Sequence, residues 1–113
     1  MCDDTRLTAL CAAVDVDDDI PVRVESRGTP FAVFRRGGRH YITQDACAHG
    51  PGSLAEGFVD GDEIECPFRQ GRFHIPTGCP STPPCTVPLR VWEARVLGGN
   101  ICIDVNAGRT EGG

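Results

Sequence analysis

The chain lacks several features that would assign it to a familiar class of protein. No apolar run approaches the roughly 20 residues that a membrane-spanning helix needs, and MCDDTRLTAL has no basic stretch followed by an apolar one, so no signal peptide is evident. A basic excess is also missing, because the formal net charge is −5, and this argues against nucleic-acid binding. With 113 residues the chain suffices for one domain, residues 1–113, and not for two. We therefore expect a single-domain protein of the cytoplasm.

Cysteine is what the chain has in excess. Seven cysteines cannot all pair within one chain, and without a secretion signal metal binding is a better default than disulfides. Cys47 and Cys66 lie among Gly, Pro and His residues, where a metal site is plausible. Cys11 and Cys102 lie in apolar-rich segments, and we interpret them as small core residues.

The pattern of short apolar runs predicts an all-β fold. Fourteen glycines and nine prolines disfavour long helices, and Gly-Gly at 37–38 and 98–99 and Asp-Gly at 60–61 are typical of hairpin turns. We expect an antiparallel domain of many short strands and a disordered tail over 106–113. The expected strands are 6–10, 21–26, 31–36, 39–44, 57–60, 62–66, 71–75, 89–96 and 100–105.

Two loops rich in Gly and Pro interrupt this β pattern. They are 45–56 (DACAHGPGSLAE) and 66–71 (CPFRQG), and a short hairpin joins them. Because they would emerge from neighbouring strands, we expect them to face each other at one tip. That arrangement would bring together four residues: Cys47, His49, Cys66 and Arg69.

The four residues form a Cys-x-His pattern followed, after sixteen residues, by Cys-x-x-Arg. Thiolate and imidazole ligands suit both zinc and iron–sulfur clusters. Gly50, Gly52 and Gly71 would let backbone N–H groups approach an anionic sulfur, which tunes a cluster and is less needed at a structural zinc. A small zinc protein stays an alternative, which colour distinguishes, since zinc proteins are colourless and iron–sulfur proteins brown-red.

The segment CAHGPGSLAEGFVDGDEIECPFRQGRFHIPTG (47–78) resembles the cluster-binding segment of Rieske [2Fe–2S] proteins, above all the small Rieske ferredoxins of bacterial aromatic-ring-hydroxylating dioxygenases. The flanks YITQDACAHG and VPLRVWEARVLGGNICIDV extend the resemblance to roughly residues 5–105. It implies the Rieske fold, an antiparallel β base domain with an inserted two-loop cluster-binding subdomain at about 45–77. It further implies that Cys47 and Cys66 hold one iron, and that His49 and position 69 hold the other, solvent-facing iron.

Position 69 departs from the family pattern, which has histidine where this chain has Arg69. A guanidinium offers no lone pair. Its pKa lies so far above neutral pH that its neutralisation at pH 7 costs about 9 kcal/mol, of which a nearby metal offsets a part. Four interpretations stay open. Arg69 is a substitution that loses or weakens the cluster; Arg69 ligates iron; another residue ligates, His74 or more weakly His40; or no iron binds and the fold serves as a structural or docking module.

Two absences refine the resemblance. The cluster loops carry no additional cysteine pair of the kind that forms a disulfide in respiratory-chain Rieske proteins, which favours the soluble, lower-potential ferredoxin type. The chain also has no room for the mononuclear-iron domain of a catalytic oxygenase subunit, so we expect no catalytic activity of its own.

The resemblance implies an electron carrier that takes one electron from a flavin-containing reductase and passes it to a terminal oxygenase. Its partners would dock at the tip formed by 47–52 and 66–71, with Pro51, Phe68 and Gln70 around the histidine edge, and we expect the carrier to be a monomer. The alternative is a Rieske-like structural small subunit of an oxidoreductase such as nitrite reductase, without a functional cluster.

Overall fold

The computed structural model describes residues 7–18, 20–26, 28–45, 53–65, 72–82 and 89–110. Within these ranges every paired strand is antiparallel and the helical segments are short 3-10 turns, none of them long and apolar enough to cross a membrane. The predicted all-β, antiparallel class is therefore confirmed. The 3-10 turns are η2 (Ala13–Asp15), η3 (Leu54–Glu56) and η4 (Val105–Ala107).

The strands form three sheets. The largest has five strands in the order β12 (Arg109–Thr110), β9 (Arg90–Trp92), β4 (Arg39–Gln44), β3 (Thr29–Arg36) and β2 (Val22–Ser26). The second has three strands in the order β1 (Thr8–Ala12), β11 (Asn100–Ile103) and β10 (Arg95–Leu97). The third has four strands in sequence order, β5 (Phe58–Asp60), β6 (Glu63–Glu65), β7 (Arg72–His74) and β8 (Pro80–Thr82).

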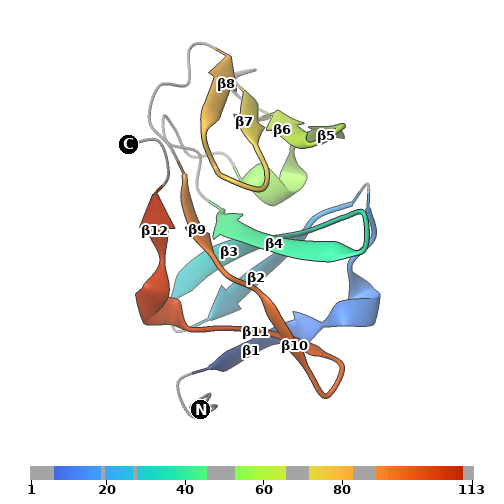
Figure 1. Cartoon of the computed structure of the whole chain (residues 1–113), viewed down its shortest axis with the longest axis vertical. Coiled ribbons are helices and arrows are strands. Elements are labelled where there is room, and N and C mark those ends of the chain that lie inside the picture. Colours follow the sequence, from blue (N-terminus) through green and yellow to red (C-terminus); the bar gives the residue numbers. More distant parts are fainter. Residues whose placement is uncertain are drawn as a thin grey trace.

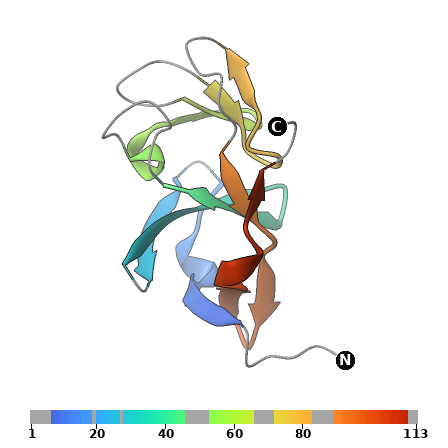
Figure 2. The same ribbon diagram turned by 90° about the vertical axis from the view of Figure 1, so that its left-hand side faces the viewer.

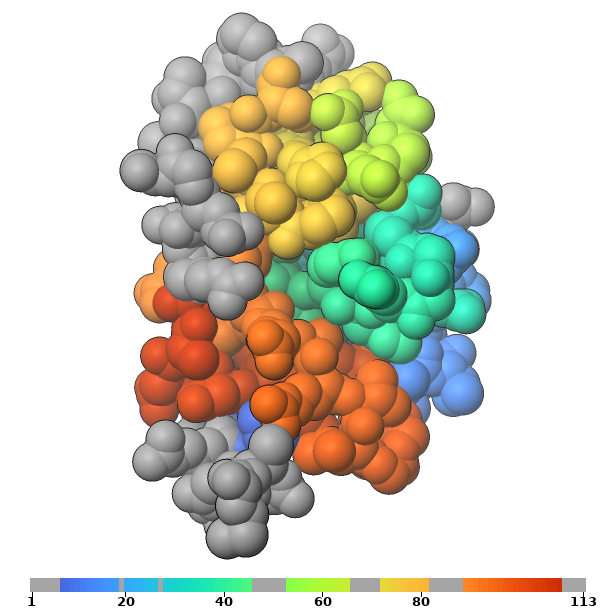
Figure 3. Space-filling model, in the orientation of Figure 1, coloured from blue at the N-terminus to red at the C-terminus, as the bar shows by residue number. Residues whose placement is uncertain are grey.

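The three sheets are arranged in tiers. The five-stranded sheet lies in the middle, with the β5–β8 sheet at one end and β1, β10 and β11 at the other (Figures 1 and 2). On the face drawn in Figure 3, the yellow and green atoms of β5–β8 pack directly against the teal atoms of β4. In sequence β5–β8 run between β4 and β9, so we call the four-stranded sheet the insertion. The other two sheets together form the base.

Strand β3 separates two hydrophobic cores. Its residues 31–34 are all buried, and because successive side chains point to opposite faces they divide between the cores. Ala32 and Phe34 face the insertion, in a cluster with Leu54, Ile64, Phe73, Ile75 and Leu89. Phe31 and Val33 face the base, in a cluster with Val16, Ile42, Trp92, Ile101 and Ile103. One strand thus anchors the insertion to its base.

Trp92 organises the base core and also corrects the prediction of a disordered tail. Its ring meets Phe31 edge-on, with centroids 4.9 Å apart, and its indole Nε1 donates to the Val105 carbonyl at 3.1 Å. A Cβ on Gly108 would collide with the indole, and β12 then pairs with β9. Residues 106–110 are therefore structured, because a large buried indole needs both an apolar cover and a hydrogen-bond acceptor.

Other strand predictions differ from the structure in instructive ways. The strand expected over 89–96 is two strands, β9 and β10, because the chain leaves the five-stranded sheet after Trp92 and joins the three-stranded one. Strands β8 and β12 were not predicted; β8 contains Pro80, and β12 has two residues. The predicted hairpins about 37–38, 60–61 and 98–99 are confirmed by the β3–β4, β5–β6 and β10–β11 pairs.

Candidate metal centre

The four predicted ligands, Cys47, His49, Cys66 and Arg69, lie outside the described residues, as do Pro51, Phe68 and Gln70 of the expected docking tip. What the structure describes is the frame from which the two loops leave and to which they return. Asp45 and Ser53 flank the first loop, and Glu65 and Arg72 flank the second.

A buried carboxylate holds the base of the first loop. Asp45 follows β4 directly and is 3% exposed. Its Oδ1 accepts hydrogen bonds from the Ala55 backbone N–H at 2.9 Å and from the Ser53 hydroxyl at 2.9 Å, and its Oδ2 lies 2.7 Å from the same hydroxyl. The Asp45 carbonyl also accepts from the Leu54 N–H at 2.7 Å. The two ends of the 46–52 segment are therefore tied together through one residue.

Arg23 supplies the positive charge beside this carboxylate. Its Nε donates to Asp45 Oδ2 at 3.1 Å from β2, two strands away from β4 in the sheet. Burying a carboxylate is costly unless it is paired and hydrogen-bonded, and Asp45 meets both conditions. The 48% exposure of the Arg23 side chain shows that the cation itself stays in contact with water.

The base of the second loop is a closed hairpin. Glu65 on β6 pairs with Arg72 on β7, so residues 66–71 leave from and return to neighbouring positions. The Arg72 guanidinium lies 2.8 Å from Asp60, 3.5 Å from Glu63 and 3.3 Å from Glu65. The hydrogen bond to Asp60 raises the pKa of Arg72. The Arg72 side chain on β7 therefore joins this strand to β6 and β5, at the point where the second loop returns.

The two loop bases touch each other through η3. Leu54 is fully buried with Ile64 and Phe73 of the four-stranded sheet, and the Gly57 N–H donates to the Leu54 carbonyl at 3.0 Å. A Cβ on Gly57 would collide with the carbonyl oxygen of Glu65, the residue before Cys66. The turn that begins at the end of the first loop thus ends against the residue that precedes the second. That the loops themselves face each other at one tip stays a prediction, because 46–52 and 66–71 lie outside the described residues.

The two histidines considered as substitute ligands lie in β strands. His74 on β7 pairs with Glu63, two residues beyond the Glu65–Arg72 pair that closes the loop, and its Nδ1 is 3.1 Å from the Thr77 hydroxyl. His40 on β4 pairs with Arg35; burial and the Arg35 charge lower the pKa of His40. The contact with Thr77 favours a structural role for His74. The buried Nε2 of His40 has no hydrogen-bond partner among the described residues.

Two further cysteines lie in the base and not near the loops. Cys102 is buried, as predicted, and Cys11 is half-buried at the edge of the base core. Burial and the nearby Asp15 carboxylate raise the pKa of Cys11. Among the described residues no group of three or more His, Cys, Asp or Glu side chains is placed to hold a metal ion.

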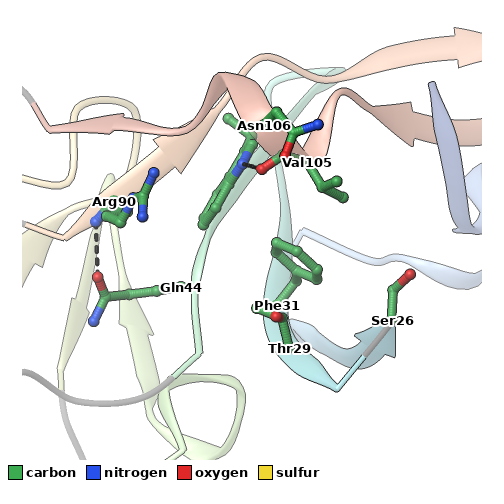
Figure 4. A pocket seen from close by; sticks show the side chains of 8 residues that line it. Ser26, Thr29, Phe31, Gln44, Arg90, Val105 and Asn106 are labelled. Carbon is green, nitrogen blue, oxygen red and sulfur yellow. Dashed lines mark hydrogen bonds between the residues drawn. The ribbon is translucent and has the colours of Figure 1, made fainter. Parts of the chain in front are cut away.

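A hollow of about 300 Å³ lies beside Trp92, at the end of the sheet from which the first loop departs. Phe31, Gln44 and Arg90 contribute to its wall, and the Arg90 backbone N–H donates to Gln44 Oε1 at 2.9 Å (Figure 4). The Arg90 guanidinium carbon lies 5.6 Å from the centroid of the Trp92 ring. Among the described residues that line this hollow there is no carboxylate, thiol or imidazole.

Comparison with known proteins decides the family. Residues 6–93 match the Rieske [2Fe–2S] domain. The chain belongs to the Rieske [2Fe–2S] family. Two curated relatives are the ferredoxin CarAc of Metapseudomonas resinovorans, 47% identical over 95 residues (83% of this chain, 89% of the relative), and the ferredoxin component of the p-cumate 2,3-dioxygenase system of Pseudomonas putida, 43% identical over 105 residues (91% and 89%).

Solved Rieske structures agree with this assignment. The Sphingomonas yanoikuyae B1 ferredoxin is 36% identical, with a TM-score of 0.83 over 86% of this chain and 96% of that one. The ferredoxin match in a complex of reduced oxygenase and oxidized ferredoxin in carbazole 1,9a-dioxygenase is 45% identical, with a TM-score of 0.81 over 87% and 92%. A putative nitrite reductase small subunit, 20% identical with a TM-score of 0.72, shares the fold alone. The chain is therefore a Rieske ferredoxin, an electron carrier and not a catalyst.

The donor set fits a Rieske cluster at three positions and departs from it at the fourth. Cys47 and Cys66 offer thiolates and His49 an imidazole, the ligands that such a centre uses. Arg69 as a guanidinium has no lone pair to offer. The described frame suits the cluster, because both loop bases are closed and their ends are joined through η3.

Sequence reasoning did not single out the residues that hold this frame. Asp45, Ser53 and Gly57 appeared only as parts of a loop and a strand, since none of them falls in a ligand-spacing motif. Their partners lie across the loop or on another strand, so a sequence period does not reveal them. The nearest sequence signal is Asp45 itself, which lies between the apolar strand YIT and Cys47. A carboxylate is not expected to be buried at such a position.

Proposed function

We propose that this Rieske ferredoxin takes one electron at a time from a flavin-containing reductase and passes it to the terminal oxygenase of an aromatic-ring dioxygenase system. The observation that carries the proposal is the 45% identical ferredoxin in complex with its reduced oxygenase. Curated relatives named as ferredoxin components of p-cumate and biphenyl dioxygenase systems support the same role. We include a reductase because a carrier that donates electrons to an oxygenase must first receive them from another protein.

We propose Cys47 and Cys66 as the ligands of one iron, and His49 and position 69 as the ligands of the other. When bound, the cluster supplies a centre that accepts and releases a single electron. The chain holds the two loops closed at their bases and keeps water from the apolar core beneath them. At position 69 a guanidinium either gives up a proton to bind iron or leaves that coordination position to another donor, and both weaken the site relative to histidine.

Both partners would dock at the tip formed by 47–52 and 66–71, with Pro51, Phe68 and Gln70 in the contact. The described surface beside this tip supports such a contact. Phe58 is 65% exposed and pairs across the sheet with Glu65, next to Cys66. Around it three carboxylates share one guanidinium, so this side of the tip is acidic. We expect a basic partner surface here, and electron-transfer rates that fall as salt rises.

Purified protein and its Arg69→His variant test the cluster directly. Iron and sulfide are measured per chain, and the reduced proteins are compared by electron paramagnetic resonance. Two irons and two sulfides per chain in both forms, with different spectra, support cluster binding with altered ligation at position 69. A cluster found in the Arg69→His variant alone shows that Arg69 prevents the parent chain from holding the cluster.

A chain without iron in either form contradicts the proposal. Stable association of that iron-free chain with a larger oxidoreductase would then favour the structural-subunit alternative. Electron transfer from a flavin reductase to an oxygenase, measured with and without the chain, tests the carrier role separately. We also place the carrier in the cytoplasm as a monomer, for which light scattering should give a mass near 12.1 kDa.

A further inference from the structure

The structure links the two cluster loops through a path that no ligand motif contains. The path starts at Asp45, two residues before Cys47, and runs through the hydrogen bonds of its carboxylate to Ser53 and Ala55. It continues along η3 to Gly57 and ends at the backbone of Glu65, one residue before Cys66. Each end of the path therefore adjoins a cysteine of a different loop.

The Asp45 end is built to resist displacement. The Ser53 hydroxyl has one hydrogen and lies within 2.9 Å of both carboxylate oxygens, so it bridges them. The Ala55 N–H is a backbone donor in the first turn of η3, where the Ser53 side chain makes no cap of its own. Asp45, which follows β4, thus accepts a hydrogen bond from the first turn of η3, and it does so 3% exposed, where an unpaired donor or acceptor is expensive.

The Gly57 end leaves no room for adjustment. A Cβ there would strike the Glu65 carbonyl oxygen, which is backbone and has no alternative rotamer. Between the two ends Leu54 is fully buried against Ile64, the neighbour of Glu65 on β6. Because buried side chains pack without voids, η3 cannot slide relative to β6 without disturbing the core.

We propose that η3 is a strut of fixed length, and that Asp45 and Gly57 are positioning residues that set the first loop against the second. This inference rests on the proposed function, since the loops are taken to carry the cluster ligands. A strut matters to such a centre because the two irons draw ligands from both loops. Groups outside the ligand shell commonly change metal affinity about 10- to 100-fold when they are altered.

Asp45→Asn is the principal variant, because asparagine keeps the shape and replaces one acceptor oxygen with a donor. Asp104→Asn is its matched control. Asp104 is the N-cap residue of η4, where its side chain accepts from the Asn106 N–H at 3.0 Å, and it lies in the base. Gly57→Ala tests the other end of the strut, and Ser53→Ala is a milder variant should Asp45→Asn fail to fold.

The readouts are the reduction potential, the electron paramagnetic resonance spectrum of the reduced protein and the rate of cluster loss, each beside a urea unfolding curve. We expect Asp45→Asn and Gly57→Ala to shift the potential, to change the spectrum and to speed cluster loss about tenfold. Asp104→Asn should leave all three readouts unchanged even if it lowers stability. Cluster properties in Asp45→Asn and Gly57→Ala that match the parent, with only stability lost, would overturn the proposal.

Amide chemical shifts of the metal-free protein separate this inference from the proposed function. A strut predicts that Asp45→Asn moves the signals of Glu65 and Arg72, which flank the second loop, as well as those of 53–57. Shifts confined to 53–57 contradict it. If neither the parent nor Arg69→His binds a cluster, the proposed function fails, and this measurement still decides whether η3 couples the loops.

Discussion

The β3–β4 and β6–β7 hairpins pair in the same antiparallel way and differ in what closes them. In β3–β4, Arg36 pairs with Arg39 across a turn of Gly37 and Gly38, both with positive φ. In β6–β7, Glu65 pairs with Arg72 across residues 66–71. The first hairpin needs only a tight turn, and glycine supplies it.

The second hairpin spans the six residues 66–71 between its strands, and its closing pair is held from outside. Arg72 binds carboxylates on β5 and β6, and Gly57 brings η3 against Glu65. Like charges face each other at the closing pair of β3–β4, whereas opposite charges do so at β6–β7. The closing pair of β6–β7 therefore joins opposite charges, and its Arg72 also contacts β5. The β3–β4 hairpin closes on a Gly-Gly turn, and the side chain of its Arg36 donates to the Asp18 carbonyl outside the hairpin at 2.6 Å.

The largest effect should come from the two cores on either side of β3. Phe73→Ala in the insertion and Phe31→Ala in the base should each cost about 3–5 kcal/mol of unfolding free energy, since both rings are fully buried. Because β3 belongs to both cores, we expect a single domain over residues 1–113 that unfolds in one step. Urea unfolding followed by Trp92 fluorescence and by circular dichroism should give coincident transitions in both variants. Two separated transitions in Phe73→Ala would mean that the insertion folds by itself.

The next effect compares two glycines of positive φ. Gly38 in the base has φ +81° and open space around its Cα, so Gly38→Ala carries only backbone strain, roughly 1–2 kcal/mol. Gly78, after β7, has φ +74°, and a Cβ there would lie 2.8 Å from the Leu89 carbonyl oxygen. We expect Gly78→Ala to lower the melting temperature more than Gly38→Ala. Equal losses would show that the contact with Leu89 yields easily, and that the insertion is less tightly built than its base.

A smaller effect should follow from Arg72, the staple below the second loop. Arg72→Gln leaves Asp60, Glu63 and Glu65 facing one another without their shared cation. We expect a lower melting temperature in dilute buffer and partial recovery in about 1 M salt, which screens the repulsion. Arg95→Gln is the matched control, because the Arg95–Glu93 contact is longer, at 3.8 Å, and lies in the base. The same loss in both variants, at low and high salt, would contradict a special role for Arg72.

The sequence was most informative where structure is local. The pair of glycines at 37–38 between the strand-like runs FAVFRR and RHYITQ predicted the β3–β4 hairpin, with β4 at 39–44 as expected. The Asp-Gly at 60–61 and the Gly-Gly at 98–99 likewise predicted the β5–β6 and β10–β11 hairpins. These features succeed because a turn, a period or a short motif determines them within a few residues.

The sequence was least informative where distant segments decide. Trp92 orders residues 106–110 because its ring and indole N–H need partners, and no local signal marks that segment as structured. The division of 89–96 into two strands follows from which sheet each half joins. Asp45 looks like a loop residue until Arg23 and Ala55 are placed beside it. Each of these features is a tertiary contact, and such contacts override local propensity.

The smallest expected effect is the pH dependence of stability that His40 contributes in the β3–β4 hairpin. His40 pairs with Arg35 in β3–β4, and burial followed by the Arg35 charge lowers its pKa from the usual 6.5. The unfolded chain then binds a proton more tightly than the folded one, so stability attributable to His40 is present above pH 6.5 and declines as the pH falls below it.

His40→Gln removes this dependence without adding a charge. We expect the variant and the parent to have similar free energies of unfolding at pH 8, and the parent to lose more than the variant between pH 6.5 and 5, by urea unfolding at each pH. Taking the difference between the two proteins at each pH cancels the titration of every other group they share. A difference that stays constant with pH would show that His40 titrates alike in the folded and unfolded chains, and that Arg35 is screened by water at this end of the hairpin.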